Sequence, residues 1–126
     1  MKKCGGTLPP MEEINYEGRL FRSVENSDNG EVGAETQFEY HQEGPYIWAR
    51  YGGGEIRLGQ LLGEVTPGGK LSFRYHHYNR SGEYRSGQCE ATPELLPDGR
   101  LRLRERWQWT NGDESRGESV VEEARR

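Results

Sequence analysis

The side chains with the clearest chemical potential lie in the C-terminal half of the 126-residue sequence. Within residues 75–77 and 105–109 they occupy every second position, and side chains two residues apart share one face of a β-strand. Aromatic rings beside a few polar groups are typical of a small-molecule site. We predict a ligand-binding site in which Tyr75, Trp107 and Trp109 stack on the ligand. Its polar contacts are predicted to come from His77, Arg85 and Glu105.

Glu105 carries the second hypothesis, which is an acid-base enzyme. The strand pattern directs its carboxyl group inward, where a carboxylate must be paired, protonated or bound to a ligand. A raised pKa would suit Glu105 to proton transfer, with His77 as the partner group. The alternative without a catalytic role is a hydrogen bond from Ser119 or from a Tyr or Trp donor, or an ion pair with Arg85.

Metal and cofactor chemistry find no support in the motifs. His76 and His77 are adjacent on a predicted strand and so point to opposite faces, while His41 lies on the face opposite Phe38. We therefore expect no histidine metal site. Phosphate-binding loops, dinucleotide fingerprints and nucleophile elbows do not occur, so we predict no cofactor and assign no catalytic residue. Cys89 is expected to be a buried, unreactive thiol.

Turn sequences divide the chain into the segments that must position these residues. They are Asn29-Gly30, Glu43-Gly44-Pro45, Gly52-Gly53-Gly54, Pro67-Gly68-Gly69, Ser81-Gly82, Asp98-Gly99 and Asn111-Gly112. Seven turns imply eight strands, predicted over residues 14–25, 32–42, 46–51, 55–66, 71–79, 84–96, 100–110 and 114–123. Such a meander closes naturally into an all-β, eight-stranded antiparallel up-and-down barrel.

Loop length predicts how three of the hairpins pair. With three-residue loops at 80–82, 97–99 and 111–113, small residues face large ones inside and opposite charges meet outside. The inward pairs are His77 with Arg85, Tyr75 with Gly87, Phe73 with Cys89, Cys89 with Trp107, Gly87 with Trp109, Ala91 with Glu105, Trp107 with Gly117 and Glu105 with Ser119. The outward pairs are Glu94 with Arg102, Glu90 with Arg106, Arg106 with Glu118 and Arg102 with Glu122.

These registers give the barrel interior two different ends. The end near residues 97–99 is predicted to be closed by an apolar plug of Leu71, Leu95, Leu101, Leu103 and Val121. The opposite end, near loops 80–82 and 111–113, carries the six candidate site residues. An apolar floor below an aromatic and polar mouth is the layout of a small-ligand pocket.

Trp48 carries the third hypothesis, a non-catalytic structural or interaction module. It shares a face with Arg50, which indicates that this face is outward and that Ile47 and Tyr51 point inside. An exposed Trp48, together with Tyr46, predicts a homodimer contact. A cation-π cover from a neighbouring arginine is the alternative.

Composition limits the possible partners. A net charge of -4 offers no basic surface for nucleic acid. No apolar run approaches the length of a membrane span, and no signal peptide is apparent, so we expect a cytoplasmic protein. Residues 1–13, which include Cys4, are predicted to form a flexible arm, and residues 14–126 a single barrel domain. Free thiols are expected in that compartment.

Four segments resemble a known family: Asn15-Tyr16-Glu17-Gly18-Arg19, Gly87-Gln88-Cys89, Thr92-Pro93-Glu94-Leu95-Leu96-Pro97-Asp98-Gly99-Arg100 and Glu105-Arg106-Trp107-Gln108-Trp109-Thr110. The family consists of small uncharacterised bacterial proteins, some labelled N-acetylglutamate synthase. The resemblance spans about residues 14 to 123. It implies an avidin-like or lipocalin-like barrel with a ligand in its interior, and it supplies no catalytic residues. Acetyl transfer from coenzyme A usually requires a strand-to-helix phosphate loop, which this sequence lacks, so we expect a binding protein.

Overall fold

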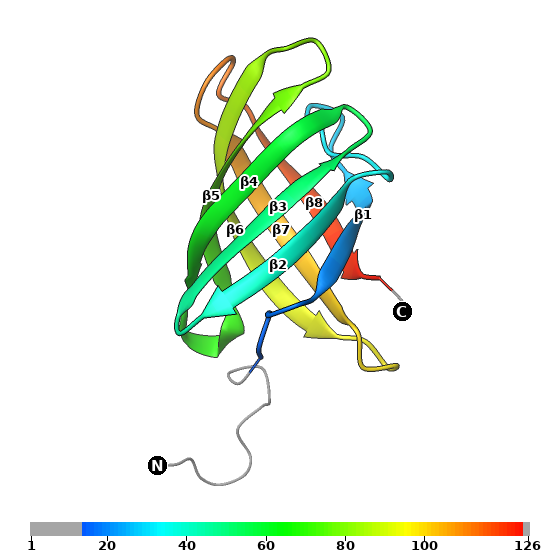
Figure 1. The fold of residues 1–126 in the computed structure, drawn as a ribbon, viewed down its shortest axis with the longest axis vertical. Coiled ribbons are helices and arrows are strands. Elements are labelled where there is room, and N and C mark those ends of the chain that lie inside the picture. Colours follow the sequence, from blue (N-terminus) through cyan, green and yellow to red (C-terminus); the bar gives the residue numbers. More distant parts are fainter. Residues whose placement is uncertain (1–13, 125–126) are drawn as a thin grey trace, which may run out of the picture.

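The computed structural model describes residues 14–124 and contains eight strands that close into one antiparallel barrel. The strands are β1 (Leu20–Asn26), β2 (Gln37–Glu43), β3 (Tyr46–Gly53), β4 (Ile56–Val65), β5 (Leu71–Asn79), β6 (Tyr84–Leu95), β7 (Leu101–Trp109) and β8 (Arg116–Glu123), with the short 3-10 helix η2 (Pro67–Gly69) before β5. Each strand pairs with the next, and β8 pairs with β1 (Figure 1). The predicted fold class is confirmed, while the predicted arm, residues 1–13, lies outside the described residues.

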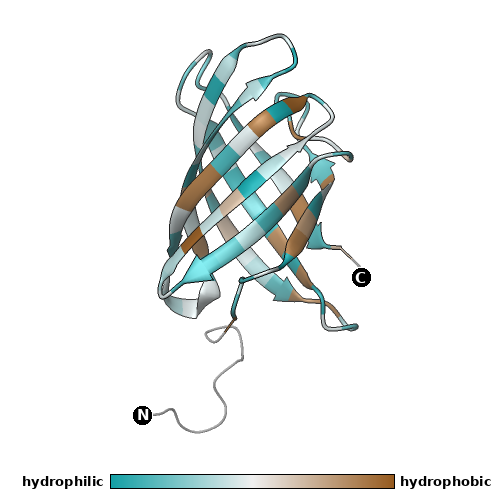
Figure 2. Ribbon diagram, in the orientation of Figure 1, coloured by the Kyte–Doolittle hydropathy of each residue, from teal (hydrophilic) through white to brown (hydrophobic). Residues whose placement is uncertain are grey.

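Alternation of apolar and polar side chains explains why these segments form a barrel wall. In β3, Ile47 and Tyr51 are buried, whereas Trp48 and Arg50 face outward as predicted. Figure 2 shows the same mixture of hydrophobic and hydrophilic positions along the other strands. An alternating strand buries one face and leaves the other in water, so a barrel can form from a chain that is only 31% hydrophobic.

The three registers predicted from loop length are confirmed. In the β5–β6 pair, Phe73 lies opposite Cys89 and His77 opposite Arg85. The β6–β7 pair places Ala91 opposite Glu105, and the β7–β8 pair places that glutamate opposite Ser119. All the predicted outward charge pairs occur in these two strand pairs as well. The turn chemistry therefore sets the positions of the interior residues.

Glycines make room for aromatic rings inside the wall. The indole of Trp107 lies across Gly117, where an added Cβ would clash with ring carbons. Tyr75 crosses Gly87 in the same way. Each of these glycines faces an aromatic ring across a strand pair, so a narrow interior can hold large rings without empty space around them.

Side chains from both halves of the chain close the end of the barrel near residues 97–99. Leu71, Leu101, Leu103 and Val121 are buried there as predicted. Leu95 is not, because it is the last residue of β6 and its side chain is 58% exposed at the rim. Tyr16, from the segment before β1, belongs to this core instead, and its hydroxyl donates to the carbonyl of Gly69 at 2.9 Å.

The connection between β1 and β2 differs most from the prediction. A tight turn at Asn29-Gly30 was expected, but β1 ends at Asn26 and β2 begins only at Gln37, so residues 27–36 form a longer loop, the mouth loop. β1 itself begins at Leu20, later than the predicted residue 14. Gly30 and Gly33 interrupt the apolar-polar alternation here, which weakens the tendency to continue a strand. β1 and β2 pair over only three residue pairs, from Leu20 with Glu39 to Arg22 with Gln37.

Candidate functional site

A small cavity lies inside the barrel at the end covered by the mouth loop. Its volume is about 40 Å³. Five of the six predicted site residues line it, namely Tyr75, His77, Glu105, Trp107 and Trp109, together with residues of the mouth loop and of β2, β3 and β4. The registers that β5, β6 and β7 share thus bring side chains from distant parts of the sequence to one place.

The sixth predicted residue, Arg85, lies at the rim of this cavity. Its guanidinium group sits 3.9 Å from the centre of the Trp109 ring, which is cation-π geometry. The predicted alternative of an ion pair between Arg85 and Glu105 is wrong, because the guanidinium binds Glu31 instead, with 2.8 Å between Nη1 and Oε2. The arginine therefore covers the indole ring of Trp109 and does not line the cavity.

Glu31 and Asn79 are site residues that the sequence did not indicate, and Glu31 is the one that joins the others. Its carboxylate accepts hydrogen bonds from His77 Nε2 at 2.8 Å, from Arg85 Nη1 at 2.8 Å and from Asn79 Nδ2 at 3.1 Å. It belongs to the mouth loop, where no strand register fixes which way a side chain points. The available signal was weak, namely an acidic residue between two glycines in a segment without alternation.

The protonation states at the mouth follow from these contacts. Burial lowers the pKa of His77, despite the opposing hydrogen bond to Glu31. Desolvation acts to raise the pKa of Glu31, but hydrogen bonds from His77 and Asn79 outweigh it and hold that pKa below its ordinary value. A neutral His77 thus donates through Nε2 to an ionised Glu31, while its Nδ1 accepts from the Tyr51 hydroxyl at 3.0 Å.

Glu105 is buried in the interior, and one of its predicted alternatives is confirmed. The Ser119 hydroxyl donates to its Oε1 at 2.7 Å. Burial raises the pKa of Glu105 to about 7, so the carboxyl group changes charge near neutral pH. This raised pKa meets one requirement of the acid-base hypothesis. The second requirement is one open cavity shared with His77. Both residues line the same cavity, which at about 40 Å³ is too small for a larger substrate in this conformation.

The mouth loop is what closes the cavity. The backbone carbonyl of Asn29 accepts a hydrogen bond from Trp109 Nε1 at 3.0 Å, and Trp107 packs against Gly30. A volume of about 40 Å³ has room for only a few water molecules. Ligand pockets for larger molecules measure roughly 300 Å³ or more, so entry of such a ligand requires the loop to move.

Comparison with known proteins agrees with this architecture. The family model of avidin-like proteins matches residues 14–124. The chain belongs to the avidin-like family. The search of curated proteins and the search of solved structures returned no match. Membership in the avidin-like family supports a small barrel of ligand-binding type in general, and no ligand is specified by it.

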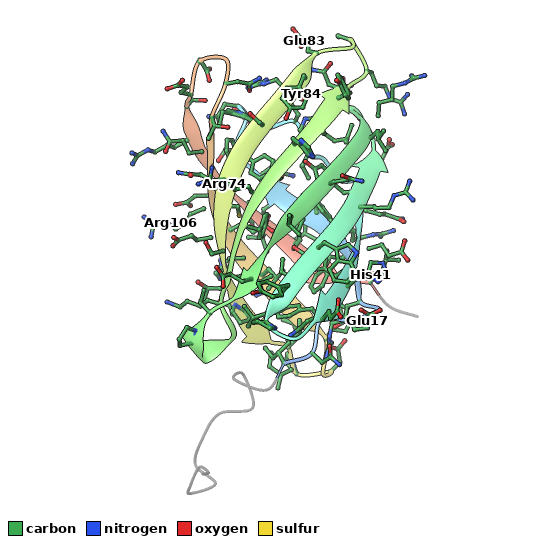
Figure 3. All side chains as sticks on the ribbon, turned by 60° about the vertical axis from the view of Figure 1, so that its left-hand side comes forward. Glu17, His41, Arg74, Glu83, Tyr84 and Arg106 are labelled. Atoms are coloured by element: carbon green, nitrogen blue, oxygen red, sulfur yellow. The ribbon has the colours of Figure 1, made fainter. Side chains whose placement is uncertain are left out.

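The outer face of the avidin-like barrel carries exposed apolar side chains around Trp48. Trp48 on β3 lies directly opposite Leu62 on β4, and the two are 38% and 67% exposed. The neighbour stacked on Trp48 is His41, at 5.6 Å between ring centroids, rather than an arginine. His41 in turn lies beside Glu17 (Figure 3), with 3.1 Å between Nδ1 and Oε2.

Cys89 is buried with a free thiol, and burial raises its pKa well above the ordinary value, as expected for an unreactive cysteine.

Residues 14–124 contain no group of three or more His, Cys, Asp or Glu side chains placed to hold a metal ion. None of the helices in this part of the avidin-like chain is long and apolar enough to cross a membrane.

Proposed function

We propose that this avidin-like barrel binds a small molecule in the mouth half of its interior, beneath the mouth loop. The observation that carries the proposal is the convergence of three aromatic rings and several polar groups on one residual cavity. Tyr75, Trp107 and Trp109 touch edge to face, with centroids 5.7 and 5.4 Å apart along the series Tyr75–Trp109–Trp107. Such rings present flat apolar walls to a ligand.

The mouth loop is the element that admits the ligand. It follows the part of β1 that no longer pairs with β2, since that pairing ends at Arg22 and Gln37. Its tie to the neighbouring wall at its far end is the hydrogen bond from Thr36 Oγ1 to the Gly53 carbonyl at 3.0 Å. At its near end, Ser27 bonds to Glu118, and Asn29 bonds to Ser115 and Arg116. Opening is therefore expected of residues 30–35, which pair with no strand and are held to the wall by the Glu31 contacts. Opening removes Gly30, Glu31 and Val32 from the cavity and leaves the aromatic walls in place.

The experiment measures interior tryptophan fluorescence in a Trp48→Phe variant, which keeps only Trp107 and Trp109. Benzoate and neutral benzamide serve as small aromatic probes. Saturable quenching that disappears in the further variant Trp109→Phe supports the proposal. Native mass spectrometry of the purified full chain is the second measurement, since a co-purifying ligand appears as a defined mass increment. Absence of both saturable quenching and any mass increment contradicts the proposal.

A second candidate function is self-association through the outer face at Trp48. Tyr46, Trp48 and Leu62 are all exposed, and the direct pairing of Trp48 with Leu62 makes the apolar surface continuous across β3 and β4. Contiguous exposed apolar patches commonly mark protein contacts, and a two-fold dimer joins identical patches. Size-exclusion chromatography with light scattering should give a mass of twice 14.5 kDa for the wild type.

The matched variants are Trp48→Ala and Leu95→Ala, since Leu95 is an equally apolar exposed residue in another part of the barrel. Self-association through β3 and β4 predicts a monomeric mass for Trp48→Ala and an unchanged mass for Leu95→Ala. A wild type that is already monomeric at micromolar concentration removes this candidate.

A further inference from the structure

We propose that His77, Asn79 and Arg85 form a binding site for the carboxylate of a small ligand, and that Glu31 fills this site from within when the mouth loop is closed. The inference rests on the proposed function and narrows the class of ligand. The ligand is a monocarboxylate whose apolar or aromatic part points into the cavity below.

All three donors belong to the barrel wall, whereas their acceptor belongs to the loop. His77 and Asn79 are on β5 and Arg85 is on β6, and their nitrogens lie 2.8, 3.1 and 2.8 Å from the Glu31 carboxylate oxygens. When the mouth loop opens, Glu31 moves away and the three donors remain in place on the wall. Buried donors without an acceptor are costly, so the opened site favours the entry of another carboxylate.

The wall holds these donors in place independently of Glu31. Asn79 Oδ1 accepts hydrogen bonds from the backbone amides of Ser81 and Glu83, at 3.0 and 2.9 Å. That fixes the side-chain amide with its Nδ2 toward the mouth. Tyr51 fixes the ring of His77, and stacking on Trp109 fixes the guanidinium of Arg85. A donor set held this way is organised before a ligand arrives, which reduces the entropy lost on binding.

Glu31 uses the site incompletely. It engages Arg85 through Nη1 only, and Arg85 Nε is buried without a hydrogen-bond partner among the described residues. A carboxylate not tethered to the loop can accept from Nε and a terminal nitrogen together, in the two-bond geometry that guanidinium groups favour. A free ligand can therefore accept a hydrogen bond from Arg85 Nε, which Glu31 leaves unused.

The charges around the site favour a ligand that carries a single negative charge. Glu83 Oε1 accepts from Asn79 at 2.8 Å, and Asp113 is close enough to Arg85 for the arginine charge to help lower the carboxyl pKa, after hydrogen bonds from Ser115. His77 is neutral, so Arg85 is the one full cation among the three donors. Two nearby carboxylates with one cation disfavour phosphate and other multiply charged anions.

The cavity below determines the rest of the ligand. Trp109 lies directly under the Arg85 guanidinium, and Tyr75 and Trp107 continue the aromatic wall inward. A carboxylate bound at Arg85 thus directs its apolar part among these rings. Benzoate has this form and serves as the probe, and benzamide is its neutral counterpart of nearly the same shape.

The decisive variant is Glu31→Ala, which removes the internal competitor. If Glu31 occupies the site at least about nine-tenths of the time, its removal should strengthen benzoate binding at least about tenfold, since binding no longer competes with a closed state. Affinity is measured by tryptophan fluorescence in the Trp48→Phe background and by calorimetry. The double variant Glu31→Ala, Arg85→Gln should bind benzoate no better than benzamide.

The outcomes separate this inference from the proposed function. A preference for benzoate over benzamide in Glu31→Ala that is lost with Arg85→Gln supports the carboxylate site. Equal binding of benzoate and benzamide in Glu31→Ala overturns it and leaves lumen binding intact. Binding of neither probe to Glu31→Ala overturns the carboxylate site, and it overturns the proposed function as well only if native mass spectrometry shows no co-purifying ligand. If Glu31→Ala does not fold, Glu31→Gln is used, and there acetate should raise the melting temperature where equimolar acetamide does not, whereas equal effects of the two contradict the inference.

Discussion

The Ser119 hydroxyl donates to Glu105 Oε1 at 2.7 Å across the β7–β8 pair, inside the barrel. This contact pairs the carboxyl group with a neutral partner and not with a cation. The effect of burial is therefore larger than the opposing effect of the Ser119 hydrogen bond, and the pKa of Glu105 rises to about 7. The interior thus contains an acid that is largely neutral at mildly acidic pH and becomes charged as the pH passes neutrality.

Glu105→Gln should therefore change the pH dependence of stability. The folded pKa lies above the ordinary value of 4.5, so the stabilisation from the bound proton is fully present below that value and is lost as pH rises through about 7. Relative to Glu105→Gln, the wild type should lose about 3 kcal/mol of unfolding free energy between pH 4 and pH 8. Urea unfolding of both proteins across this range measures the difference. Parallel pH profiles would show that Glu105 ionises normally.

Gly117→Ala should destabilise the barrel, because the new methyl group would overlap the indole ring of Trp107. Overpacking of this kind costs about 1–3 kcal/mol. Gly33→Ala is the matched control, since a Cβ at Gly33 meets no atom within 4 Å. Thermal and urea unfolding of the two variants should differ accordingly. Equal stability of the two would mean that Trp107 can move aside freely.

Tyr16 and Tyr40 are buried beside each other, with ring centroids 6.1 Å apart, and should respond oppositely to loss of their hydroxyl groups. Tyr16→Phe removes the hydrogen bond to the Gly69 carbonyl and should cost about 1–2 kcal/mol. The Tyr40 hydroxyl is buried without a partner among the described residues, so Tyr40→Phe should be neutral or stabilising. Denaturant unfolding compares the pair under identical conditions. A Tyr40→Phe variant less stable than Tyr16→Phe would refute the claim that the Tyr40 hydroxyl makes no stabilising contact.

Cys89 offers a reporter for opening of the mouth loop, because it lines the cavity and its thiol is buried. In a Cys4→Ser background, a small methanethiosulfonate reagent should label native Cys89 slowly. Glu31→Ala should accelerate labelling, since it removes the contacts to His77 and Arg85 that hold the loop. Mass spectrometry at timed intervals gives the rate. A rate unchanged by Glu31→Ala would show that reagent reaches Cys89 by another route.

Local sequence signals were sufficient for the wall of the barrel. The glycines at the turn near residue 99 and at residue 112 have positive φ and favour tight loops of defined length. Loop length then determined which residues face one another, so the inward positions of Cys89, Glu105 and Trp107 could be predicted. Such predictions work because hairpin pairing depends on neighbours in the sequence.

The ends of the barrel could not be predicted in the same way. Tyr16 reaches Gly69 and Glu31 reaches His77 across 53 and 46 positions in the chain. Neither residue is held there by a strand register, and both contacts join segments that only the closed wall brings together. The prediction that Leu95 is buried was wrong for a related reason. Leu95 is the last residue of β6, and at the rim an inward-facing position is open to solvent.

Within residues 14–124, the buried tyrosine and leucine plug closes the end of the interior that lies opposite the mouth loop. Whatever enters past the mouth loop must leave by the same path, in reverse order. Association and dissociation would then share one gating step, so a substitution that slows loop opening should lengthen the residence time of a ligand as much as it delays its arrival. Equilibrium affinity would stay unchanged under such a substitution, while the exchange rate alone would fall.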